Sequence, residues 1–261
     1  MRAVLRYRYL FGQLVRRELR QKYRGSVLGV VWYLVNPLVL MGAYWLMFGR
    51  LLPGVSEPDY PLFLMVGLLV WIFFSATLLS ATGAFLAHGS LIGKVRFPRE
   101  MIPASVASVQ FVTFGILLLL LTPIMVAVRG TFDPALLLLP FIVLCLFVFV
   151  LGLSLMVSVL HAYYRDMEPI LSAALLPWFF LSPIFFRPER LPGLHSSEVA
   201  RIALTWVNPV APFINAMRSV LYAGTTPTWK TLVYVAAAAA LALLCGHLLF
   251  RRMERELAVV V

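Results

Sequence analysis

The segment GSLIGKV at residues 89–95 comes closest to a nucleotide-binding loop. A phosphate-binding loop has four residues between its glycines, and a Ser or Thr after its Lys contributes the hydroxyl that binds Mg²⁺. Here only three residues separate Gly89 from Gly93. Val95 follows Lys94, where a hydroxyl is required. The segment therefore does not predict ATP hydrolysis by this chain.

Acidic residues and histidines could also carry chemistry, but their positions do not favour it. The Asp and Glu residues lie in flanks and loops, outside the long nonpolar stretches, and the four His residues show neither clustering nor zinc-binding spacing. Transporters coupled to protons or ions usually place ionisable groups at membrane depth. If the chain moves a substrate, a partner is therefore expected to supply the energy. No cofactor is expected on this chain.

The composition predicts an integral membrane protein. Hydrophobic residues make up 62% of the chain and charged residues 13%, against about 45–50% and about 25% in soluble domains. Uncharged stretches long enough to cross about 30 Å of hydrocarbon as helices recur along the chain. We therefore expect one all-α domain over residues 1–261 with six transmembrane helices. The expected spans are approximately 27–49, 61–87, 103–128, 135–160, 169–186 and 231–250.

Two further segments are expected to lie at the membrane surface. Residues 202–217 are nonpolar but contain Pro209 and Pro212, which predicts short re-entrant or interfacial helices between the fifth and sixth spans. Residues 1–24 place most of their arginines on one helical face, which predicts a basic amphipathic helix on the inner leaflet. This helix could serve only as a topology anchor, or its basic residues could also contact a phosphate-bearing substrate.

The distribution of basic residues also predicts the orientation. The net charge of +11 comes largely from segments between nonpolar stretches, with the densest cluster in residues 1–24. Because cytoplasmic segments are enriched in Lys and Arg, both termini are expected in the cytoplasm. Membrane topology thus explains the charge, and no nucleic-acid partner is expected.

Aromatic side chains are concentrated in the first, second and fifth expected spans. Flat nonpolar rings can lie along sugar faces without strong hydrogen bonds, which would suit a path for a long polar polymer. Ordinary packing or interfacial anchoring is the alternative explanation. The candidates for a translocation path are Tyr33, Tyr44, Trp178, Phe179, Phe180 and Phe185.

Four stretches resemble the permease subunit of bacterial ABC type-2 exporters that move polysaccharide, O-antigen or teichoic-acid-type polymers. They are VRRELRQKYRGSVLGVVW at 15–32 with Asn36-Pro37; LIGKVRFPRE at 91–100; YRD at 164–166 with LSPIF at 181–185; and Asn208-Pro209 with Arg218, Gly224, Pro227 and Trp229. The resemblance implies a homodimer in the bacterial cytoplasmic membrane that binds two separate ATPase subunits, which carry ATP and Mg²⁺. It implies a substrate that is a glycan or polyol-phosphate polymer, linked to polyprenyl pyrophosphate.

The resemblance also implies roles for particular residues. Residues 91–100 resemble the coupling helix that contacts the ATPase, although a plain basic loop is the alternative. The candidates in it are Leu91, Ile92, Lys94, Val95, Arg96, Phe97, Pro98, Arg99 and Glu100.

Three more groups of residues follow from the resemblance. The turn at Leu28 and Gly29 corresponds to the cytoplasmic lipid access site, although Gly25 and Gly29 could equally form a helix-packing motif. Candidates for pyrophosphate contact are Arg16, Arg17, Lys22 and Arg24, because cations form strong hydrogen bonds with anionic oxygens. Arg165 and Asp166 could form a gate ion pair or an ordinary surface pair.

Three rival functions stay open at this point. The first is an exporter of drugs or small lipids from the same superfamily, although the loop at residues 50–59 is too short for the large outer domain expected there. The second is a membrane enzyme acting on polyprenyl-linked sugars, and the third is a membrane scaffold that transports nothing.

Overall fold

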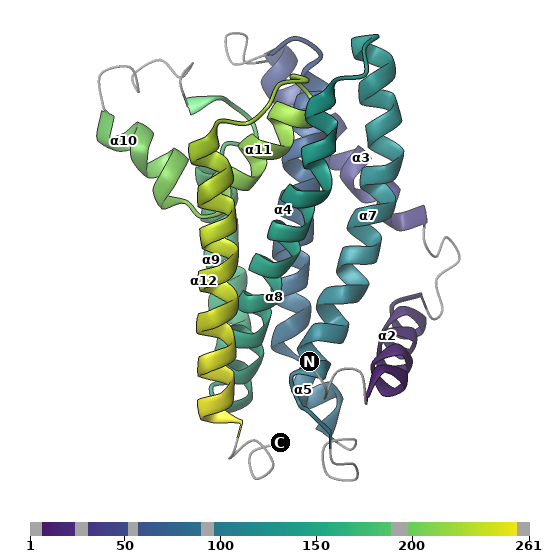
Figure 1. The fold of residues 1–261 in the computed structure, drawn as a ribbon, viewed down its shortest axis with the longest axis vertical. Coiled ribbons are helices and arrows are strands. Elements are labelled where there is room, and N and C mark those ends of the chain that lie inside the picture. Colours follow the sequence, from purple (N-terminus) through teal and green to yellow (C-terminus); the bar gives the residue numbers. More distant parts are fainter. Residues whose placement is uncertain (1–6, 24–30, 52–56, 90–96, 189–197, 255–261) are drawn as a thin grey trace.

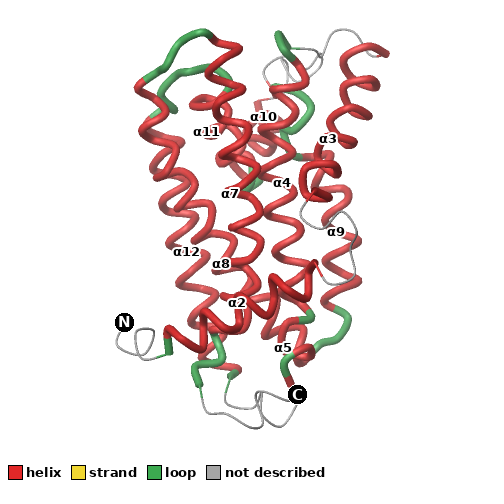
Figure 2. The backbone as a smooth tube through the Cα atoms, turned by 90° about the vertical axis from the view of Figure 1, so that its right-hand side faces the viewer, coloured by secondary structure: helices red, strands yellow, loops and turns green. Residues whose placement is uncertain are grey.

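The computed structural model describes residues 7–23, 31–51, 57–89, 97–188 and 198–254. Within these ranges every regular element is a helix, and the longest helices run side by side in an upright bundle (Figures 1 and 2). The expected all-α fold with long nonpolar helices is therefore confirmed.

Within the described ranges, four helices are long and nonpolar enough to cross a membrane. The shortest of them has 23 residues, which at about 1.5 Å per residue exceeds the hydrocarbon thickness of about 30 Å. They correspond to the second, third, fourth and sixth expected spans. The four helices are α4 (Tyr60–Thr82), α7 (Met101–Arg129), α8 (Leu139–Tyr163, preceded by the 3₁₀ helix η3, Pro134–Leu138) and α12 (Trp229–Met253).

The first and fifth expected spans correspond to shorter nonpolar helices. Helix α3 (Trp32–Tyr44) continues into the π-helix η2 (Trp45–Leu51), and α9 covers Met167–Leu181. Helix α9 ends before residue 186, the expected boundary, because Pro183 disfavours helical geometry at the residue before it. Ser182 is accordingly extended, with ψ 143°. The six-span topology therefore remains a prediction.

Short helices form one end of the bundle, called here the α11 end. They are α10 (Glu198–Ile202), η5 (Ala203–Val207) and α11 (Ala211–Leu221). Phe213 and Met217 of α11 are fully buried, and α11 packs against α4, α8 and α12 (Figure 1). The segment expected to be broken and interfacial thus does form short helices.

The amphipathic helix lies at the opposite end, called here the α2 end. Helix α2 (Arg8–Tyr23) crosses the bundle beside α7, near the short helix α5 (Ala84–Ala87), and α12 finishes at the same end (Figures 1 and 2). Leu14 is 3% exposed, whereas Arg16, Arg17 and Arg20 are exposed. The predicted division of this helix into a nonpolar and a basic face is therefore present.

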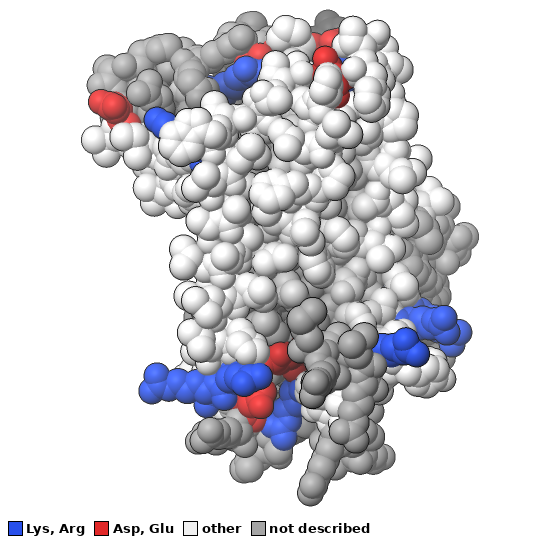
Figure 3. All heavy atoms as spheres, in the orientation of Figure 1, with Lys and Arg blue, Asp and Glu red and all other residues white. Residues whose placement is uncertain are grey.

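Charged side chains gather at the two ends of the bundle. On the face shown in Figure 3, Lys, Arg, Asp and Glu lie near the α2 end and the α11 end, and the belt between them is uncharged. Because a charge in hydrocarbon is costly, this belt is the surface that a bilayer would cover.

Candidate functional site

A buried ion pair fixes α2 to the bundle. The Nε2 atom of His88 lies 3.0 Å from Oε1 of Glu18 on α2, and the His88 side chain is only 1% exposed. The Nδ1 atom lies 2.9 Å from the Ala84 carbonyl oxygen, which orients the ring. Contact with the Glu18 carboxylate raises the pKa of His88 above 6.5, against the opposing effect of burial. The imidazolium therefore stabilises α2 in its docked position.

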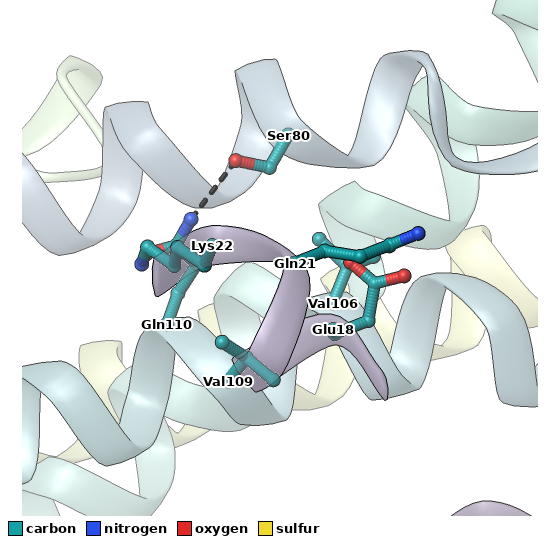
Figure 4. Close-up of a pocket in the computed structure, with 7 residues that line it drawn as sticks. All are labelled: Glu18, Gln21, Lys22, Ser80, Val106, Val109 and Gln110. Carbon is teal, nitrogen blue, oxygen red and sulfur yellow. Dashed lines mark hydrogen bonds between the residues drawn. The ribbon is translucent and has the colours of Figure 1, made fainter. Parts of the chain in front are cut away.

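A pocket of about 300 Å³ lies between α2, α4 and α7 (Figure 4). Lys22 Nζ donates a hydrogen bond to Gln110 Oε1 at 2.5 Å, and Gln110 Nε2 donates to Ser80 Oγ at 2.9 Å. Burial lowers the pKa of Lys22 to about 8. The residues that line the pocket, called here the α2 pocket, are Glu18, Gln21, Lys22, Ser80, Val106, Val109 and Gln110.

The candidates for pyrophosphate contact are not gathered in one place. Lys22 lines the α2 pocket, whereas Arg16 and Arg17 are exposed on α2 and do not line it. Arg24 and the turn at Leu28 and Gly29 lie outside the described residues. Among the described candidates, Lys22 is the one that combines a positive charge with a concave, partly buried surface.

The end of the expected coupling segment is attached to α12. Glu100 Oε1 lies 3.0 Å from His247 Nδ1 and 3.9 Å from Arg251 Nε. Arg99 Nη1 donates a hydrogen bond to the Glu254 carbonyl oxygen at 2.6 Å. Phe97 packs against the cluster around Phe85 and Phe250, and Pro98 is half-buried. The other candidates in this segment, Leu91, Ile92, Lys94, Val95 and Arg96, lie outside the described part of the chain.

The aromatic candidates divide into two groups. Tyr44 of α3 lies 5.6 Å from Phe179 and 4.7 Å from Phe185, measured between ring centroids. Phe179 and Phe185 are buried, and Phe180 is 50% exposed, so the first two rings hold α3 against α9. Trp178 instead donates a hydrogen bond through Nε1 to Asn208 Oδ1 at 3.0 Å. Tyr33 lies in α3, with its side chain outside the described set.

The candidate gate pair lies in the turn between α8 and α9. Arg165 and Asp166 are both exposed, and the structure shows no ion pair between these two described residues. Exposed charges contribute at most about 1 kcal/mol when they do pair. The described residues also contain no group of three His, Cys, Asp or Glu side chains that could hold a metal ion.

A buried arginine at the α11 end was not singled out by chemical reasoning from the sequence. Arg218 is 5% exposed, and its guanidinium lies 3.5 Å from the Phe63 ring centroid. It donates hydrogen bonds to the carbonyl oxygens of Pro183, Ile184 at 2.6 Å, and Phe63 at 3.3 Å. Arg218 therefore joins α11 to α4 and to the turn after α9. A charged residue inside a nonpolar segment was the available signal.

The acid and the histidines that anchor the α2 end were also missed as a group. Glu18, His88 and His247 lie far apart in the sequence, and only packing brings them to their partners. The available signals were His88, just after the second expected span, and His247, inside the sixth, where an ionisable group usually needs a partner. Glu18 was the single acid among the basic residues of 1–24.

Comparison with known proteins identifies the family. Residues 9–222 match the family described as ABC-2 type transporter. The chain is 30% identical to an O-antigen export system permease protein RfbA of Myxococcus xanthus, over 99% of this chain and 97% of the relative.

More distant relatives agree with this match. A Klebsiella pneumoniae protein of the same description is 30% identical over 76% of this chain and 80% of its own length. The polysialic acid transport protein KpsM of Escherichia coli is 24% identical over 92% of each chain. The resemblance noted in the sequence is thereby confirmed, and the chain belongs to the ABC-2 type transporter family of membrane-spanning permeases.

Proposed function

We propose that this chain is the membrane-spanning subunit of an exporter of O-antigen or a related polysaccharide, driven by ATP that a separate subunit hydrolyses. The observation that carries the proposal is the similarity to an O-antigen export permease over 99% of this chain. The uncharged belt on the face shown in Figure 3 supports it, because such a surface suits a subunit that sits in the bilayer.

The substrate in this proposal is a polysaccharide or polyol-phosphate polymer linked to polyprenyl pyrophosphate. Lys22 supplies a cation in the α2 pocket, at the end of the bundle where a basic surface helix lies. Arg16 and Arg17 add positive charge to α2, and Arg24 follows this helix in the sequence; this charge favours approach of an anionic headgroup. The turn at Leu28 and Gly29 provides lipid access next to this helix.

The partner in this proposal is an ABC ATPase, bound in two copies to a homodimer of this chain at the α2 end. This end faces the cytoplasm, in keeping with the basic residues of α2 and Arg251 and Arg252 of α12. Residues 91–100 contact the ATPase subunit, and that subunit binds ATP and Mg²⁺. The variant Arg99→Cys is expected to cross-link to the ATPase in at least one nucleotide state, and no cross-link in any state would contradict this assignment.

The translocation path in this proposal runs along α3 and α9. Of the described candidates, Phe180 is 50% exposed and Tyr44 and Trp178 are half-buried, so these three side chains can reach a sugar. Phe179 and Phe185 pack against Tyr44 and Phe180, and Tyr33 is the remaining candidate in α3. Arg165 and Asp166 lie at the inner end of α9, where they form the gate pair when the path changes shape.

The decisive experiment reconstitutes this chain with its ATPase subunit in liposomes. We expect a lipid-linked polysaccharide to stimulate ATP hydrolysis and to become accessible on the opposite leaflet. Deletion of the gene is expected to remove the surface polymer and leave its lipid-linked precursor inside the cell.

Each rival function predicts a different result. Stimulation by drugs or short-chain lipids, with the surface polymer unchanged, would indicate a small-molecule exporter. Cleavage of a glycosidic or phosphate bond by the purified chain alone would indicate an enzyme. Failure to copurify with any ATPase would indicate a scaffold.

A further inference from the structure

The connection between α5 and α7 is attached to a different helix at each of its two ends. At the α5 end, His88 is held by Glu18 of α2, with 3.0 Å between Nε2 and Oε1. At the α7 end, Glu100 is held by His247 of α12, with 3.0 Å between Oε1 and Nδ1. Both attachments pair a carboxylate with an imidazole.

The attachment to α2 is strongly shielded from water. The side chains of His88 and Glu18 are 1% and 19% exposed, so their attraction is screened less than that of a surface pair. The contact of Nδ1 with the Ala84 carbonyl oxygen fixes the ring on its own helix. A displacement of His88 is therefore transmitted to Glu18.

The attachment to α12 consists of several contacts. Arg251 Nε lies 3.9 Å from Glu100 Oε1, and Arg99 donates a hydrogen bond to the Glu254 carbonyl oxygen at 2.6 Å. Tyr163 at the end of α8 donates to the Met253 carbonyl oxygen at 2.5 Å. The last turn of α12 is thus joined to the start of α7 and to the end of α8.

Helices α2 and α12 lie on opposite sides of the bundle at this end (Figure 1). The two ion pairs flank the connection between α5 and α7, with His88 at its start and Glu100 at its end. Because each pair joins two separate elements, moving one flanking residue also moves the helix paired with it.

We propose that Glu18 and Glu100 are positioning residues that tie α2 and α12 to the two ends of one inner connection, so that a force applied there moves both helices together. The inference rests on the proposed function, because the ATPase subunit would supply that force. It goes beyond that function by naming the residues that carry the movement to each helix.

The test measures hydrogen exchange by mass spectrometry in the reconstituted complex, with and without a non-hydrolysable ATP analogue. In the wild-type complex, exchange is expected to change in both α2 and the last turns of α12. Glu18→Gln is expected to suppress the change in α2 alone, and Glu100→Gln the change in α12 alone. Each variant is also expected to lower the amount of polymer moved per ATP hydrolysed.

The matched control is Glu168→Gln, which removes an exposed carboxylate at the same end of the bundle and is expected to leave both responses intact. The exchanged pair Glu18→His with His88→Glu should recover the response of α2. Wild-type responses in Glu18→Gln and Glu100→Gln complexes that hydrolyse ATP and export polymer would overturn this inference and leave the proposed function standing. Failure of the wild-type chain to bind an ATPase would overturn both.

Discussion

Gly152 of α8 faces Gly246 of α12 at a distance that admits no side chain. A Cβ atom on Gly246 would lie 2.2 Å from the Gly152 carbonyl oxygen, and one on Gly152 would lie 2.3 Å from the Ala242 carbonyl carbon. Small residues let helix backbones approach closely, which is how membrane helices gain packing energy without a hydrophobic driving force. The alanine-rich run at residues 236–240 also gives α12 small side chains, which allow a neighbouring backbone to approach closely.

Substitution of this contact is expected to destabilise the bundle. Gly152→Val or Gly246→Val should cost about 2 kcal/mol, because the two backbones must separate to admit the side chain. Thermal unfolding in detergent would report this as a lower midpoint. Gly115→Val is the control, since nothing lies within 4 Å of a Cβ there. Equal midpoints for Gly246→Val and Gly115→Val would show that α8 and α12 do not pack this closely.

Removal of the Arg218 guanidinium is expected to loosen the α11 end. Arg218→Met leaves the carbonyl oxygens of Phe63, Pro183 and Ile184 without their donor, at a cost of at least about 2 kcal/mol. Arg218→Lys should recover only part of the loss, because an ammonium lacks the planar set of donors. Thermal unfolding again provides the measurement.

The control for this prediction is Arg252→Met, an exposed residue of α12. An Arg218→Met protein as stable as this control would contradict the structural role assigned to Arg218.

Docking of α2 is expected to weaken as the pH rises. The pKa of His88 is raised above 6.5 by Glu18, so the pair stabilises the docked helix fully below about pH 6.5. That contribution disappears as the pH rises through the raised pKa. Limited proteolysis of α2 should therefore be faster at alkaline pH than at pH 6. His88→Gln should remove this dependence, and an unchanged pH profile in that variant would refute the role of the pair.

Transport of a phosphate-bearing lipid is expected to depend on the charge of Lys22. Burial lowers the pKa of Lys22 to about 8, so the ammonium loses its proton as the pH rises through this value. Export should therefore decline above about pH 8, and Lys22→Gln should lower it at neutral pH while the complex still assembles.

Lys22→Arg keeps the positive charge at alkaline pH, because a guanidinium stays protonated in this range. The variant therefore tests whether loss of the charge causes the decline in export. It should export at neutral pH and decline less than the wild type as the pH rises through about 8. The control is Arg20→Gln, which removes an exposed charge from the same helix. Equal export by Lys22→Gln and the wild type would exclude Lys22 from the substrate path. Replacement of Arg16, Arg17, Lys22 and Arg24 together would then test whether these basic residues as a group are needed for export.

The pattern of nonpolar and charged residues was sufficient to predict the helices. Long uncharged stretches predicted α4, α7, α8 and α12, and the face periodicity of residues 1–24 predicted α2, because these properties depend on neighbours a few positions apart. The same reasoning placed short helices around Pro209. It overestimated the length of α9, which ends where Pro183 makes Ser182 extended.

The tertiary structure alone decided which side chains meet. Arg218 and Phe63 are separated by 155 positions, and His88 and Glu100 find their acidic and basic partners on helices that are distant in the sequence. Phe179 could equally have lined a path or filled the core, and packing against Tyr44 buries it. Local periodicity fixes the face of a helix on which a residue lies, but its partner depends on how whole helices pack, which no short stretch of sequence specifies.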